Sequence, residues 1–162
     1  MQFLRRNIFA LCALVVFLGS SAPQDGEINY APRGSFAALS VPDADASVNW
    51  YREMLGFELV NSTDMANGIK MRNVKRANAL LEFVEHPSAS SVEKRLPDIE
   101  KPYQLHGIWK LGFSVTDFDS LHAQLTQNSA TFHGGIVTDA DGTRMLIVLD
   151  NAGNRVQLFE TR

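Results

Sequence analysis

Short runs of alternating hydrophobic and polar residues are separated in this chain by stretches with the period of a helix. Residues 36–41 alternate, which predicts a β-strand. Residues 43–56 place apolar side chains at helical spacing and end at Gly56, which predicts a helix begun by Asp43 or Asp45. Three further strands are predicted at residues 57–60, 69–74 and 79–84.

The second half of the chain has the same order of patterns. Residues 108–115 alternate and predict a strand, and Asp117 or Asp119 then begins a helix that carries Leu121 and Leu125 on one face. Three more strands are predicted around Phe132, at residues 145–149 and at residues 155–159. Each half therefore predicts a βαβββ module.

The two halves also resemble each other in sequence. Residues 40–45, Ser-Val-Pro-Asp-Ala-Asp, recur as residues 114–119, Ser-Val-Thr-Asp-Phe-Asp, at the same point of each module. One such module is too small to bury a good core alone. We therefore predict an α+β fold in which two tandem βαβββ modules form a pseudo-twofold curved sheet with a concave cup.

The amino-terminal segment differs from the rest of the chain. Arg5 and Arg6 precede an apolar run at residues 8–18 and then small residues, the layout of a secretory signal peptide. We predict a secreted or periplasmic protein, with an uncleaved amino-terminal anchor, and so a membrane attachment, as the alternative. The predicted organisation is a signal peptide at 1–22, a flexible lead-in at 23–34 and one domain at 35–162, with modules at about 35–86 and 106–162 and a polar linker at 87–105.

Charge and cysteine content exclude several classes of function. The formal net charge is −3, so no basic field is present to hold a nucleic acid. The single cysteine, Cys12, lies inside the predicted signal peptide. A mature chain would then have no disulfide, cysteine-ligated metal or catalytic thiol. The partners that we expect are a small-molecule ligand and, as an option that the sequence leaves open, a second copy of the chain.

Three segments carry a resemblance to a known family. Residues 36–57, from Phe-Ala-Ala-Leu-Ser-Val-Pro-Asp to Trp-Tyr-Arg-Glu-Met-Leu-Gly-Phe, residues 111–117 and residues 150–160 resemble the vicinal oxygen chelate superfamily, which includes glyoxalases, bleomycin-resistance-like proteins and extradiol dioxygenases. The resemblance implies the paired βαβββ fold and, in many members, a divalent metal bound by His and Glu on the first and last strands of the modules. The fold itself hosts many chemistries.

The ligand positions that the resemblance implies fall on four residues: Phe36, Glu82, Lys110 and Gln157. Phe36 offers no donor atom, Lys110 brings a positive charge, and Gln157 is a weak neutral donor. Only Glu82 keeps the expected type of ligand. We therefore predict no intact metal site and no cofactor, with a divalent metal held by displaced ligands such as His86 and His106 as the alternative.

The same positions form the predicted ligand-binding face. Glu82 and Lys110 occupy neighbouring sites in the family geometry, so an ion pair between them is expected to replace the metal, either as structure or as an anchor for a small polar ligand. Phe36 would form an apolar wall, and Arg144 could reach a ligand carboxylate at the rim of the cup.

The sequence leaves three functions open. The leading hypothesis is an exported glyoxalase-like domain with a degenerate metal site that binds a small polar molecule in its cup. The alternatives are a divalent-metal-dependent lyase or dioxygenase with displaced ligands, and a structural or partner-binding domain with a collapsed cavity. Catalysis itself stays undecided, and no catalytic residue is assigned.

Overall fold

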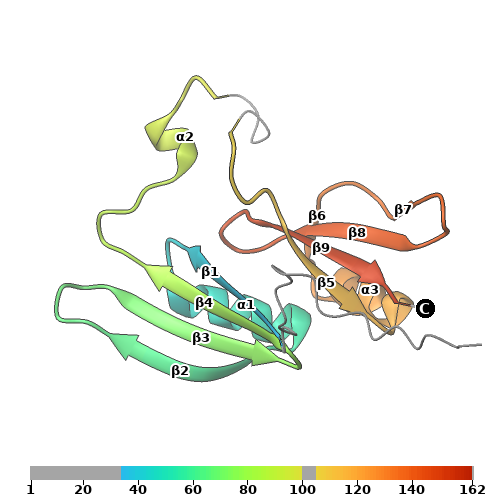
Figure 1. Ribbon diagram of the computed structural model, residues 1–162, viewed down its shortest axis with the longest axis horizontal. Helices are drawn as coiled ribbons and strands as arrows, with labels where there is room; N and C mark the ends of the chain where they lie inside the picture. Colours follow the sequence, from blue (N-terminus) through green and yellow to red (C-terminus); the bar gives the residue numbers. More distant parts are fainter. Residues whose placement is uncertain (1–33, 100–104, 162) are drawn as a thin grey trace, which may run out of the picture. The chain divides into compact units, whose positions relative to one another are not determined.

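The computed structural model describes residues 34–99 and 105–161, which contain two β-sheets and their helices (Figure 1). The α+β class predicted from the sequence is confirmed. The predicted signal peptide and nearly all of the lead-in lie outside the described residues. No helix among those residues is both long and apolar enough to cross a bilayer.

The first sheet has four strands in the order β1-β4-β3-β2. Strand β1 pairs in parallel with β4, and the other neighbours pair antiparallel. Helix α1 follows β1 and packs on one face of the sheet, so this half has the predicted βαβββ order. Its elements are β1 (Ser35–Ser40), α1 (Ala44–Leu55), β2 (Glu58–Asp64), β3 (Lys70–Arg76) and β4 (Ala79–Glu85).

The second sheet has the order β5-β9-β8-β6, with β7 also paired to β8. Strands β5 and β9 pair in parallel, as β1 and β4 do. The tandem-module prediction is met only in part, because β6 and β7 have two residues each and β7 is an additional strand. The elements are β5 (Leu111–Val115), α3 (Phe118–Gln127), β6 (Thr131–Phe132), β7 (Val137–Thr138), β8 (Arg144–Leu149) and β9 (Arg155–Glu160).

Local sequence sets the ends of helix α1. The Asp43 carboxylate accepts a hydrogen bond from the backbone N–H of Ala46 at 2.9 Å, so Asp43 rather than Asp45 is the N-cap. Gly56 ends the helix in the left-handed conformation, with φ of 64°, where glycine carries no steric penalty. A four-residue helix, α2 (Val92–Arg95), lies in the segment predicted as a polar linker.

Each half buries an apolar layer between its helix and its sheet. Tyr51 of α1 is fully buried and its ring lies 4.9 Å from that of Phe83 on β4. The second half buries side chains of α3, β8 and β9 in the same way: Phe118, Leu125, Leu146, Val148, Val156 and Leu158. Each such side chain contributes about 1.5–3 kcal/mol when it is removed from water.

Side-chain contacts join the two halves. The Tyr51 hydroxyl donates to the Asp150 carboxylate at 3.2 Å, and both residues are buried. The rings of Phe57 and Phe113 lie 5.5 Å apart. Asn128, just after α3, donates to the carbonyl of Glu53 at 3.2 Å. Aromatic packing and a buried hydrogen bond therefore hold the halves together.

Candidate functional site

Each sheet has a face covered by its helix and an opposite, open face. In β4 the buried residues Leu81 and Phe83 point toward α1, so Glu82 lies on the open face. In β9, Val156 and Leu158 point toward α3, and Gln157 lies on the open face. A ligand can therefore approach the sheets only from their open faces.

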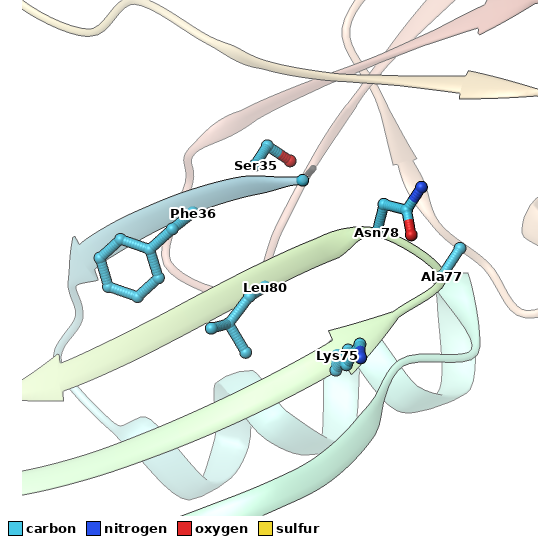
Figure 2. A pocket seen from close by; sticks show the side chains of 7 residues that line it. Ser35, Phe36, Lys75, Ala77, Asn78 and Leu80 are labelled. Atoms are coloured by element: carbon cyan, nitrogen blue, oxygen red, sulfur yellow. The ribbon is translucent and has the colours of Figure 1, made fainter. Parts of the chain in front are cut away.

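Phe36 borders a cavity of about 340 Å³ at one end of the first open face. Figure 2 shows its ring beside Leu80 of the neighbouring strand, with Lys75 on the next strand. The Phe36 side chain is 60% exposed, which is unusual for a phenylalanine. Phe36 thus lines this cavity with an apolar side chain, and Glu82 does not line it.

Glu82 lies further along β4, where its register partners are Ala38 on β1 and Asn73 on β3. The Oδ1 atom of Asn73 is buried and has no hydrogen-bond partner among the described residues. A buried acceptor without a partner costs about 1–3 kcal/mol, and such atoms often mark a place where a ligand or water binds. Asn73 was not predicted as a site residue, because its position opposite Glu82 depends on the pairing of β3 with β4.

Gln157 is the most buried of the four residues at the family's metal-ligand positions, with 2% of its surface exposed. Its Nε2 atom contacts the sulfur of Met145 at 2.9 Å, and its Oε1 atom has no partner in the described part of the chain. Gly112 is its neighbour on β5, and the ring of Phe159 fills the space where a side chain at Gly112 would lie. An amide with one unpartnered end is thus fixed on the open face of the second sheet.

Lys110 directly precedes β5 and is exposed. Its Nζ atom lies 5.8 Å from the centre of the Trp109 ring, and the Arg155 guanidinium lies 6.0 Å from the same ring. The predicted ion pair between Lys110 and Glu82 does not form: within residues 34–99 and 105–161, neither takes part in an ion pair. Trp109 and Arg155 were not predicted as site residues.

Arg144 lies on the helix-covered face of its sheet, so it does not reach the open face as expected. It donates to Glu160 at 2.6 Å and to Asp119 at 2.7 Å, and its guanidinium lies 4.9 Å from the Phe118 ring. This contact lowers the pKa of both carboxyl groups by hydrogen bonding. Arg144 is therefore a structural residue that ties β8 to α3.

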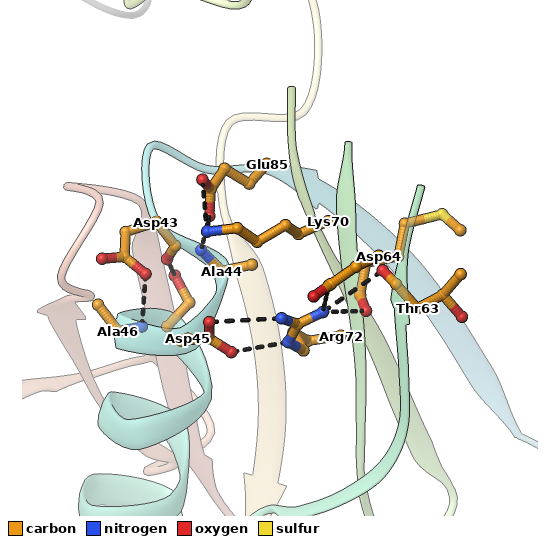
Figure 3. A network of polar contacts seen from close by, with 11 residues as sticks. Asp43, Ala44, Asp45, Ala46, Thr63, Asp64, Lys70, Arg72 and Glu85 are labelled. Atoms are coloured by element: carbon orange, nitrogen blue, oxygen red, sulfur yellow. Dashed lines mark hydrogen bonds and ion pairs between the residues drawn. The ribbon is translucent and has the colours of Figure 1, made fainter. Parts of the chain in front are cut away.

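Arg72 makes the corresponding contact in the first half (Figure 3). Its guanidinium donates to Asp45 at the start of α1 and to Asp64 at the end of β2, at 2.7 and 2.6 Å. Hydrogen bonding from Arg72 lowers the pKa of Asp45. The second aspartate of each Asp-x-Asp motif, Asp45 or Asp119, thus anchors its helix to an arginine of the sheet instead of capping the helix.

The four residues at the family's metal-ligand positions do not fit a divalent metal. Glu82 is one carboxylate, Gln157 a neutral amide, Lys110 a cation and Phe36 a hydrocarbon, whereas such a metal needs several unprotonated oxygen or nitrogen ligands. No group of three or more His, Cys, Asp or Glu side chains arranged to hold a metal occurs in the residues that the structure describes.

The alternative of displaced histidine ligands gains no support from the geometry. His86 and His106 are both exposed, and the Nδ1 atom of His86 is engaged by Ser88 at 2.8 Å. Neither belongs to a cluster of potential ligands in the described segments.

Comparison with known proteins identifies the family. The family model of the Glyoxalase/Bleomycin resistance protein/Dioxygenase superfamily matches residues 35–158, so the chain belongs to this superfamily. No protein of curated function matches the sequence. The resemblance to the vicinal oxygen chelate superfamily is therefore confirmed.

Solved structures show the same fold. A glyoxalase family protein from Enterococcus faecalis has a TM-score of 0.62 at 20% identity, over 79% of this chain and 95% of that chain. One from Bacillus cereus has a TM-score of 0.63 at 17% identity, over 82% and 96%. A lactoylglutathione lyase from Agrobacterium tumefaciens has a TM-score of 0.53 at 20% identity, over 77% and 90%. At these identities the likeness concerns the fold alone.

Proposed function

We propose that this chain is an exported, metal-independent member of the glyoxalase superfamily that binds a small polar molecule on the open face of its sheets. The proposal rests on the chemistry of the four residues at the family's metal-ligand positions. Only Glu82 among them is a residue type that binds the metal in the family. The superfamily fold hosts many activities, so function must be argued from these residues and not from the fold.

Unpartnered polar atoms support a binding role over a purely structural one. Asn73 and Gln157 each keep a buried side-chain oxygen that has no partner in the part of the chain that the structure describes, and each lies on an open face. A domain with a collapsed, purely structural interior would be expected to pair or remove such atoms, because each costs free energy when the chain folds. A ligand with hydrogen-bond donors would satisfy them.

Restoring the lost ligand types tests whether these side chains are what prevents metal binding. The variant Phe36→His, Lys110→His, Gln157→Glu would combine two histidines and a second carboxylate with Glu82. We expect it to bind one Zn²⁺ or Ni²⁺ per chain and to gain thermal stability on metal addition, because binding to the folded state alone raises its stability.

A matched control replaces the same three residues by non-ligands: Phe36→Leu, Lys110→Gln, Gln157→Met. This control and the natural chain are expected to show no metal-dependent rise in melting temperature. A folded restored variant that takes up no metal would show that the four positions do not converge, and the argument for a lost site would fail. Export is tested separately, by sequencing the amino terminus of the protein recovered outside the cytoplasm.

A further inference from the structure

One cluster on the second half of the chain is not explained by packing. Ile108 and Trp109 are 81% and 56% exposed, and two cations lie over the ring of Trp109. Lys110 Nζ lies 5.8 Å and Arg155 Cζ 6.0 Å from the ring centre. We call Trp109, Lys110 and Arg155 the tryptophan cluster.

Within the described residues, neither cation of this cluster is paired with a carboxylate. By contrast, Arg72 and Arg144, which join each sheet to its helix, each contact two carboxylates. Lys110 and Arg155 form no ion pair in the described parts of the chain. Continuing the parallel register from Leu111 opposite Val156 by one residue places them next to each other. Adjacent like charges repel, and an anion placed between them would remove that repulsion.

The cluster is continuous with the unpartnered amide of Gln157. Arg155 and Gln157 are two residues apart on β9 and therefore point to the same face. Lys110 precedes Gly112, the register neighbour of Gln157, by two residues as well. Gln157 is 2% exposed and its Oε1 atom has no partner among the described residues, so a hydrogen-bond acceptor lies on the same face as the cations, where a hydroxyl or amino group of a ligand, but not its carboxylate, could donate to it.

We propose that the tryptophan cluster binds the planar aromatic carboxylate class of ligand, with the ring stacked on Trp109 and the carboxylate between Lys110 and Arg155. This inference rests on the proposed function and specifies its ligand. Stacking on an exposed indole and charge-assisted hydrogen bonds from two cations are complementary, because the first recognises a flat ring and the second an anion. The two cations would then hold ligand oxygens without a metal.

The experiment titrates the purified full chain with 2-naphthoate, and with the neutral isostere 2-naphthamide, by tryptophan fluorescence and calorimetry. We expect naphthoate to bind and to quench Trp109, and binding to weaken as ionic strength rises. Lys110→Gln and Arg155→Gln should each weaken binding roughly fivefold or more, the effect of losing one charged contact. Trp109→Leu identifies the fluorescence signal, since Trp50 is half-buried in α1.

The matched control is Lys94→Gln, an exposed lysine of the four-residue helix α2. It should leave naphthoate affinity unchanged, and all variants should keep the melting temperature of the natural chain. The proposal is overturned if naphthoate does not bind, if it binds equally to Lys110→Gln and Arg155→Gln, or if naphthamide binds as tightly.

Metal content of the same preparation separates the two proposals. If the chain contains no metal and does not bind naphthoate, this ligand class is refuted, but the proposal of metal-independent binding is not contradicted. Stoichiometric metal would refute the proposed function, and this inference with it.

Discussion

Replacing Arg72 should destabilise the chain by an amount that its contacts allow us to work out. Its side chain is 8% exposed, and the guanidinium donates to two carboxylates and, at 3.1 Å, to the carbonyl of Met71. The carboxylates of Asp45 and Asp64 are 59% and 66% exposed, so water replaces the lost partner easily. We take about 0.5–1 kcal/mol for each ion pair and about 0.5 kcal/mol for the carbonyl contact. Arg72→Met should therefore cost about 2 kcal/mol.

Urea denaturation followed by circular dichroism measures this change. Arg72→Lys keeps the charge but loses the fork that reaches both carboxylates, so an intermediate loss of about 1 kcal/mol is expected. Arg52→Met is the matched control, because Arg52 is 57% exposed and lies 3.9 Å from Glu53; it should cost less than about 0.5 kcal/mol. If the free energy of unfolding of Arg72→Met lies within about 0.5 kcal/mol of that of the natural chain, these contacts do not stabilise the fold as assigned.

The pH dependence of the same variant gives a second check. Arg72 lowers the pKa of Asp45 below its ordinary value of 3.8. A carboxyl group whose pKa is lower in the folded state stabilises the fold above its unfolded pKa, and that contribution is lost as the pH falls through the folded pKa. The difference in unfolding free energy between the natural chain and Arg72→Met should therefore be largest near neutral pH and shrink below pH 3.8. A difference that stays constant to low pH would contradict the assigned ion pair.

Two further substitutions test other parts of the fold. Tyr51→Phe removes the buried hydrogen bond to Asp150 but leaves that carboxylate its three other donors. We expect the free energy of unfolding, measured by chemical denaturation, to fall by about 1–2 kcal/mol. An unchanged value would mean that the bond does not form. Gly56→Ala places an alanine in the left-handed conformation against the Arg76 side chain, which donates to the Leu55 carbonyl. We expect the free energy of unfolding, measured by thermal unfolding, to fall by about 1–2 kcal/mol. An unchanged or higher melting temperature would refute the assignment of Gly56 as the helix cap.

The fold could be predicted because its signals are local. Alternation in β1 and helical spacing up to Gly56 in α1 each depend on a few neighbouring residues, and Asp43 is a strong N-cap type. The face of Arg144 could not be predicted in this way. Hydrophobic residues occupy every position from 145 to 149, so the pattern does not say which face of β8 is buried.

The site was harder to predict because it depends on pairing between strands. Phe36, Glu82 and Gln157 lie on open faces as expected, since alternation alone determines this. The contact between Lys110 and Trp109, and the neighbours Asn73 and Arg155, depend on strand ends and register, which have no local signal. The expected pair between Glu82 and Lys110 was wrong for the same reason.

The most direct test of the account is the metal content of the natural chain. The chain would be purified, incubated separately with Ni²⁺, Zn²⁺, Mn²⁺ and Fe²⁺, passed over a desalting column and measured by elemental analysis. Because Phe36, Lys110 and Gln157 stand where the family has metal ligands, we expect no stoichiometric metal under any of these conditions. One tightly held metal ion per chain would contradict it and would favour metal-dependent chemistry with other ligands.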